Sequence, residues 1–362
     1  MKKLIYSAAL AVAGLMAIGT TYNVADTACI VFPQNGRDIF GLAQRNIYVI
    51  DGNRVSFIPQ LNFEGDAEDF GILVPVPSLP ELSTVNAQVF SEASFLTQPL
   101  VRSSGQGCGC DDDSNVFLAF PDEARFSAED GAIVADDGVN IIFEEVVGAY
   151  NATVLQANNP GALTVWLQEN GYQYELADSS VLAEYVQDNW FFVAMQLDPS
   201  QVPQFVDRWW SATTSPAKIS FTYDQAELRY PLKATSISTG EKAEVLIYTI
   251  SDKPMRFDGA EVEYANEIDG AEADIIAGRY PGLYDFISTG SFVTKLRKDF
   301  RRSEMDQDFM ISPSEDRREF REIVYIDNAG FQLSGLILLV LLIKLRRRFF
   351  AGEVNRDAGK SV

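Results

Sequence analysis

The stretch that decides the fold is residues 48–63, which read YVIDGNRVSFIPQLNF. Tyr48–Ile50 is apolar, and Asp51, Gly52 and Asn53 are turn residues that tolerate positive φ. Apolar residues then recur at every second position, at Val55, Phe57, Leu61 and Phe63. This pattern predicts a β-hairpin with one apolar sheet face. Pro59 cannot donate to a β-ladder, so the second strand should be an edge strand or carry a bulge there.

Further strands and helices follow in separate runs. Residues 70–74 form a short apolar run closed by Pro75 and Pro77, which predicts a strand buried on both faces. Asn159 and Pro160 begin a predicted helix that ends near Gly171. The remaining predicted elements are a helix at about 180–188 and strands at 191–195, 219–223, 230–234 and 245–250. We therefore expect an α+β fold with a largely antiparallel sheet and an inserted helical pair.

The C-terminal third predicts helices. From about Glu263 the chain takes on a helical pattern, and residues 291–328 mix both charge signs. Phe292, Leu296 and Phe300 recur at four-residue spacing, which favours a helical juxtamembrane stalk interrupted near Pro313.

An apolar segment and a cationic cluster follow the predicted stalk. Residues 329–345 are predicted as one transmembrane helix, anchored by Lys344, Arg346, Arg347 and Arg348, with a basic cytoplasmic tail at 346–362. The apolar run is short for a ~30 Å hydrocarbon core, so the cationic stems would have to extend it. The alternative is a buried core helix.

The first residues have the layout of a secretory signal. Lys2 and Lys3 precede an uncharged apolar stretch at 4–18, which predicts a signal peptide over 1–28. An exported domain at 29–290 follows, with a surface loop at 103–115. The expected localisation is the cytoplasmic membrane, single-pass, with the main domain extracytoplasmic and the C-terminus in the cytoplasm. A signal that stays uncleaved leaves this orientation unchanged.

Composition excludes several function classes. The 362 residues contain no histidine, which rules out Ser-His-Asp and Cys-His catalysis and His-ligated metals. The 29 Lys and Arg residues against 51 Asp and Glu residues give a formal charge of −22. Such a charge disfavours binding to nucleic-acid phosphates. No cofactor motif is present, and no cofactor is expected.

Three cysteines are the whole thiol content. Export would favour a disulfide between Cys29 and either Cys108 or Cys110, because the latter pair could join only with strain. The alternative is a redox or soft-metal site at Cys108 and Cys110. The spacing of Asp111, Asp113 and Asn115 imitates a calcium loop, but Val116 stands where that loop needs glycine. We therefore expect a solvated acidic loop and no metal.

Two other groups of residues are candidates for function. One is an acidic turn formed by Glu64, Asp66, Glu68 and Asp69. It either fixes the entry of a buried strand or supplies acid and base carboxylates. The other is the pair Trp209 and Trp210, which are either interface aromatics or core residues.

Four stretches carry a resemblance to a known family. They read FEGDAEDFGILVPVP at 63–77, WLQENGY at 166–172, DNWFFVA at 188–194 and YPL at 230–232. Together they resemble the bacterial family called domain of unknown function 2330, over roughly residues 29–256. Gly71 and Ile72 stand where that family more often has Ala and Trp. The resemblance implies an exported, often membrane-tethered bacterial protein and supplies no catalytic residue.

Two functions from different classes fit these features. The first is a membrane-anchored, non-enzymatic binding or assembly protein of the bacterial envelope, with the lipid bilayer and another envelope protein as partners. The second is an exported carboxylate-dependent hydrolase of polysaccharide that uses the acidic turn and the tryptophans.

Overall fold

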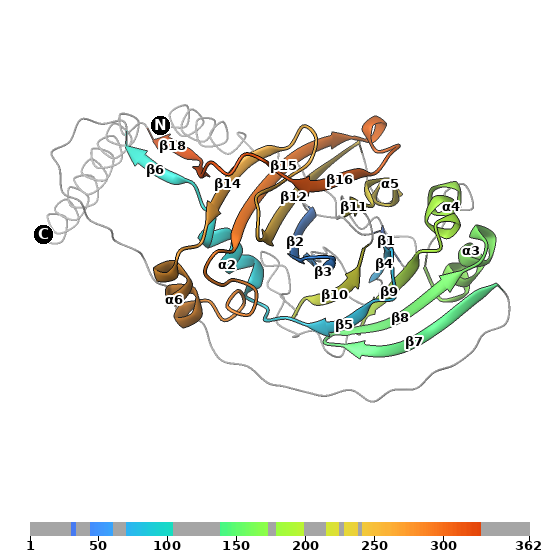
Figure 1. Cartoon of the computed structure of the whole chain (residues 1–362). Helices are drawn as coiled ribbons and strands as arrows, with labels where there is room; N and C mark the ends of the chain where they lie inside the picture. The colour runs from blue at the N-terminus through green and yellow to red at the C-terminus, as the bar shows by residue number, and fades with distance from the viewer. Residues whose placement is uncertain are drawn as a thin grey trace, which may run out of the picture. The chain divides into compact units, whose positions relative to one another are not determined.

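A computed structural model (Figure 1) describes residues 30–33, 44–60, 70–103, 138–172, 179–198, 215–223, 228–237 and 241–326. The chain divides into two compact units. The first comprises residues 1–97 and 127–320, and the second comprises residues 98–126 and 321–362. All layers and surfaces below belong to the first unit unless stated otherwise.

A five-stranded antiparallel sheet forms one layer of the first unit. Its strand order is β1-β4-β9-β8-β7. The strands are β1 (Ile30–Pro33), β4 (Phe70–Val76), β9 (Phe191–Leu197), β8 (Tyr150–Ala157) and β7 (Val139–Val147). Ile72, Leu73 and Val74 of β4 are almost fully buried, as their continuous apolar run predicts.

An eight-stranded sheet forms a second layer, in the order β17-β14-β15-β12-β2-β3-β10-β5. Its strands are β17 (Phe320–Arg321), β14 (Glu261–Glu267), β15 (Phe292–Arg301), β12 (Lys242–Ser251), β2 (Gln44–Asp51), β3 (Arg54–Gln60), β10 (Ala217–Thr222) and β5 (Glu81–Thr84). β2 and β12 run parallel, whereas β12 and β15 pair antiparallel over ten residues.

Two smaller sheets complete the described strands. β16 (Phe309–Pro313) lies between β11 (Leu228–Tyr230) and β13 (Met255–Arg256). In the second unit, β6 (Leu100–Ser103) pairs in parallel with β18 (Ile323–Ile326).

The helices of the described residues are short. They are α2 (Val89–Leu96), α3 (Pro160–Glu169), α4 (Ser179–Gln187), α5 (Leu232–Thr235), α6 (Gly270–Arg279) and the 3₁₀ turn η4 (Arg302–Glu304). The side chain of Asn159 accepts a hydrogen bond from the Ala162 N–H at 2.7 Å, with Pro160 in the first turn, so α3 begins at its predicted cap.

Alternation along the strands creates three apolar clusters and four layers. In β12, Val245 and Ile247 face a core shared by the two large sheets, and Leu246 and Tyr248 face the opposite side. α3 and α4 cover the outer face of the five-stranded sheet, where Leu73 lies. α2 and α6 cover the outer face of the eight-stranded sheet, and Figure 1 shows each helix pair beside its own sheet. Both sheets are therefore buried between layers.

The predicted fold class is wrong. The described residues are mostly β, and the expected C-terminal helical stalk is absent from them. Residues 292–301 form β15, which lies between β12 and β14. Phe292, Leu296 and Phe300 are buried on one face of this strand. A spacing of four is twice the strand period as well as close to one helical turn, so this spacing alone could not distinguish the two structures.

The predicted membrane anchoring is also contradicted. Within the described ranges, no helix has the length and apolar character needed to cross a bilayer. The bilayer partner and the single-pass localisation in the cytoplasmic membrane depended on such a helix and are corrected with it. The segment at 329–345 and its cations Lys344, Arg346, Arg347 and Arg348 lie outside the described residues.

Most shorter elements were predicted correctly. The hairpin forms as β2 and β3, with Gly52 at φ +59° in its turn. α3, α4, β9, β10 and β12 lie where the sequence places them. The strand predicted at 230–234 is wrong, because β11 ends at Tyr230 and α5 follows. The expected edge strand or bulge at Pro59 is wrong, because β3 lies between β2 and β10 and pairs with β2 without a register shift. Pro59 is accommodated because the pairing of β3 with β10 ends at Phe57.

A buried carboxylate joins α4, β11 and α5 to the segment before β16. The Asp308 side chain, only 4% exposed, accepts hydrogen bonds from the Tyr185 hydroxyl at 2.9 Å and from Arg229 Nε at 2.7 Å. It also accepts the backbone N–H of Lys233 at 2.9 Å. The Arg229 guanidinium lies 5.2 Å from the ring centroids of both Tyr185 and Trp190. Burial and the adjacent Asp308 raise the pKa of Tyr185, so its hydroxyl stays protonated and donates.

We expect Asp308→Ala to lower the free energy of unfolding by about 3 kcal/mol, because it leaves the half-buried Arg229 without its innermost partner. Urea denaturation measures this loss. Asp306→Ala is the matched control, since Asp306 is exposed, and it should change stability by less than about 0.5 kcal/mol. Equal losses in the two variants would contradict the structural role of Asp308.

Candidate functional site

The residues proposed as sites from the sequence lie outside the described part of the chain. They are the acidic turn Glu64, Asp66, Glu68 and Asp69, the cysteines Cys29, Cys108 and Cys110, and the tryptophans Trp209 and Trp210. Their roles therefore stay predictions. The described residues offer a different candidate, on α6 and the turn that follows it.

A capping box fixes the start of α6. The Asp269 side chain accepts the Glu272 N–H at 2.8 Å, and the Glu272 side chain accepts the Asp269 N–H in return. An Asp followed three residues later by Glu is a sequence signal for a helix start, so the position of α6 was readable from the sequence. Our expectation of a helical pattern from about Glu263 includes α6 but begins too early, because β14 occupies residues 261–267.

The turn after α6 is docked tightly on α2. The Glu92 side chain of α2 is buried and accepts the Gly282 N–H at 2.8 Å. A Cβ atom at Gly282 would lie 2.6 Å from the Val89 backbone N and 2.7 Å from its Cα. Only glycine fits this approach without a backbone shift. The residues on both sides of Gly282 are thereby held at fixed positions.

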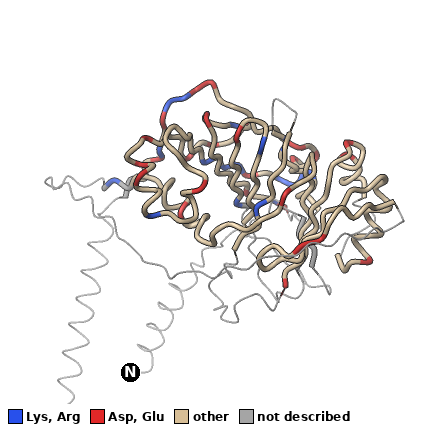
Figure 2. Tube along the Cα trace, turned by 60° about the horizontal axis from the view of Figure 1, so that its bottom comes forward, with Lys and Arg blue, Asp and Glu red and all other residues tan. Residues whose placement is uncertain are grey.

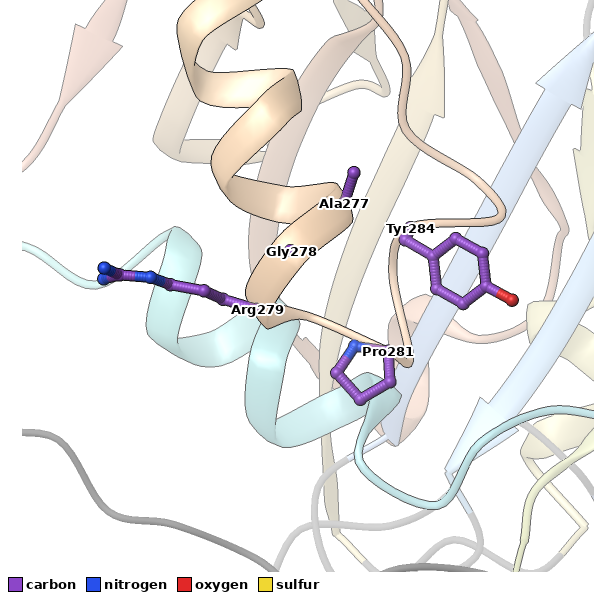
Figure 3. Close-up of a pocket in the computed structure, with 5 residues that line it drawn as sticks. All are labelled: Ala277, Gly278, Arg279, Pro281 and Tyr284. Atoms are coloured by element: carbon purple, nitrogen blue, oxygen red, sulfur yellow. The ribbon is translucent and has the colours of Figure 1, made fainter.

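An open cavity of about 280 Å³ lies at the end of α6. It is lined by Ala277, Gly278, Arg279, Pro281 and Tyr284. Figure 3 shows Ala277 and Tyr284 on one side of the helix, Pro281 below them, and the Arg279 side chain extending to the other side. No atom lies within 4 Å of a Cβ atom built at Gly278, so the helix surface is open there.

Large apolar side chains are exposed on α6, on the turn after it and on α2. Ile275 and Tyr284 are each 50% exposed, and Phe95 of α2 is 43% exposed. Ile275 lies three residues before Gly278 and therefore shares its helix face. Phe95 packs near Tyr280, with ring centroids 6.2 Å apart. Singly exposed apolar residues are ordinary, but a group around a cavity is typical of an interaction surface. We name Phe95, Ile275, Gly278, Pro281 and Tyr284 the α6 surface.

Acidic side chains flank the α6 surface. Asp274 and Asp285 are exposed, and neither forms an ion pair with a described residue. Figure 2 shows acidic and basic positions interspersed along the described trace. Arg279 also lines the cavity, but its side chain extends to the other side of the helix from Tyr284 (Figure 3). The negative charge of the whole chain adds to the two carboxylates, so the Tyr284 side of the α6 surface favours cationic ligands.

The α6 surface provides apolar area for contact with a ligand, and its side chains include few groups that could take part in catalysis. Burial raises the pKa of the Glu92 carboxyl, although the N–H groups of Gly282 and Leu283 oppose that shift. Glu92 faces these backbone groups and not the cavity. Among the residues that the structure describes, no group of three or more Cys, Asp or Glu side chains could hold a metal ion.

Two glycines of this region should respond in opposite directions to alanine. Gly282→Ala should lower the free energy of unfolding by about 1–3 kcal/mol, because its Cβ meets the backbone of α2. Gly278→Ala should raise it by roughly 0.5 kcal/mol, because alanine favours the helix and the added methyl has open space. Thermal or urea denaturation measures both, and a loss at Gly278 would contradict the open cavity.

Glu92 should make stability depend on pH. Its raised pKa means that the folded state binds the proton more tightly than the unfolded state, so protonation stabilises the fold. The stability of the wild type relative to Glu92→Gln should therefore increase as the pH falls from 7 through the folded pKa. This gain in stability should level off below about pH 4.5, which is the ordinary pKa of a glutamate carboxyl. Denaturation midpoints at several pH values measure this, and an opposite slope would contradict the burial of this carboxyl.

Comparison with known proteins identifies a family. No curated protein matches the chain. Among solved structures, the crystal structure of baculovirus P35 matches 82% of this chain and 100% of its own, at 9% identity and a TM-score of 0.31, a likeness too weak to support any argument. The model of a bacterial family matches residues 24–312, well past the limit near 256 that the sequence motifs indicated. The chain therefore belongs to the family described as uncharacterized protein conserved in bacteria (DUF2330).

Proposed function

We propose that the protein is a non-enzymatic binding protein, and that its α6 surface holds a segment of a partner protein. The partner segment carries an apolar anchor side chain flanked by lysine or arginine. The observation that supports this proposal most strongly is the exposure of Tyr284 in the lining of an open cavity, with the exposed Ile275 on the same face of α6 as Gly278.

The cavity suits one anchor side chain. Ala277 and Gly278 of α6 line it together with Pro281 and Tyr284, whose rings offer apolar contact surface. Anchors that fill such pockets provide most of the affinity of small interfaces. The capping box and the docked Gly282 keep the lining residues in place, so little conformational entropy is lost on binding.

The flanking charges of the ligand follow from Asp274 and Asp285. A lysine or arginine on each side of the anchor would face these carboxylates, and acidic flanks would be repelled. Such rim charges act mainly on specificity and association rate, so binding should weaken as salt is added. The hydrolase alternative depends on the acidic turn and on Trp209 and Trp210, and no described feature favours it.

The test uses two labelled peptides in fluorescence anisotropy. The first has the sequence Gly-Lys-Lys-Phe-Lys-Gly, and the second replaces each lysine with glutamate. We expect the lysine peptide to bind more tightly, with an affinity that falls as salt rises. Tyr284→Ala should weaken its binding about tenfold, which corresponds to about 1.4 kcal/mol.

Two further variants locate the binding. Gly278→Gln extends a side chain into the open space there and should weaken binding without loss of stability. Val165→Ala is the matched control, since Val165 is 51% exposed on α3, on the other sheet. Binding that survives both Tyr284→Ala and Gly278→Gln at full strength would exclude the α6 surface as the site.

A further inference from the structure

A second cavity, of about 360 Å³, combines both charge signs with an apolar wall. Its lining includes Val181 of α4, Lys233 and Ser236 at α5, and Arg302, Met305 and Asp306 after β15. We name it the α5 cleft. Its volume is at the lower end of the range for small-molecule sites, which is roughly 300–1,000 Å³.

Two cations of the α5 cleft are held in place by the fold. The Lys233 ammonium pairs with Glu184, and its backbone N–H donates to the buried Asp308. The Arg302 guanidinium donates to the Ser236 carbonyl at 2.7 Å, and its backbone N–H donates to the Glu241 carbonyl at 3.0 Å. An ammonium has three N–H donors, so Lys233 keeps donors beyond its bond to Glu184. Cations that are positioned before binding suit a carboxylate ligand.

Asp306 narrows the choice of ligand. Its side chain is exposed, forms no ion pair with a described residue and lines the same cleft. A doubly charged anion such as phosphate would be repelled by Asp306 and by the nearby Glu184. A ligand with one carboxylate and one ammonium group can instead pair both charges, its carboxylate with Lys233 and Arg302 and its ammonium with Asp306.

The apolar residues that line the α5 cleft determine which side chain the ligand can carry. Val181, which is partly exposed, provides apolar contact for a short side chain, next to the buried Met305. We propose that the α5 cleft binds a free α-amino acid with a small apolar side chain, in its zwitterionic form. This inference is independent of the α6 surface, with which the cleft shares no lining residue.

The test is isothermal titration calorimetry of the full chain with L-valine. Isovalerate, which lacks the ammonium, and isobutylamine, which lacks the carboxylate, are the comparison ligands, together with inorganic phosphate. We expect L-valine to bind at least tenfold more tightly than any of the three. No heat with L-valine, or equal binding of isovalerate or phosphate, would overturn the proposal.

Variants locate the binding within the protein. Asp306→Asn should weaken L-valine binding at least tenfold, and because its side chain forms no ion pair with a described residue it tests the site without unfolding it. Lys233→Met should do the same, with its melting temperature measured because it also loses Glu184. Lys253→Met is the matched control, since Lys253 is exposed. Arg302 of the cleft bonds to Glu241 at the start of β12, whereas Lys253 follows the end of this strand, about 30 Å away along it. Undiminished binding by Asp306→Asn would also overturn the proposal.

Discussion

The buried Asp308 carboxylate is the constraint on which much of the first unit depends. Its donors come from Tyr185, Arg229 and Lys233, which precede it by 123, 79 and 75 residues. A desolvated carboxylate is tolerated only when such partners surround it, so these segments must meet at one point. The next residue, Phe309, stacks on Tyr230, Phe257 and Phe300, with ring centroids 4.4–5.5 Å apart. Two consecutive residues thus tie the helical layer at α4 to the core between the sheets.

The four-layer arrangement decides where ligands can bind. Both faces of the central strands in the two large sheets are covered, so the side chains of these strands form cores and not sites. Open cavities lie instead where the outer helices end, at the turn after α6 and beside α5. In each case a buried carboxylate holds the turn by its backbone N–H groups, Glu92 at Gly282 and Asp308 at Lys233. The same interaction that stabilises each helix end therefore also fixes the shape of the adjacent cavity.

Local signals in the sequence predicted local structure well, and the errors came from distant contacts. Turn residues with alternation, a helix cap, and a run of β-branched and aromatic residues predicted the hairpin, α3 and β12 respectively, because each signal depends on neighbours in the chain. β15 was predicted as part of a helical stalk because apolar residues at four-residue spacing stand there among charges of both signs. Lys295 and Glu263 are nevertheless only 10% and 13% exposed and form an ion pair at 2.7 Å. Glu263 lies at a break in the register of β14 with β15, between Val262 and Tyr264. The periodicity of the sequence does not predict such a bulge.

The candidate site shows the same division between local and distant information. The capping box of α6 can be predicted from Asp269 and Glu272, which are three residues apart. Glycine is needed at 282 because the backbone of Val89, nearly two hundred residues earlier, lies against it. Gly71 is a parallel case, because a Cβ atom there would lie 2.7 Å from the Tyr172 ring. Glycine at 71 therefore matches the tyrosine at 172, whose ring lies close to β4. Residues of this kind become interpretable only when the partner that approaches them is known.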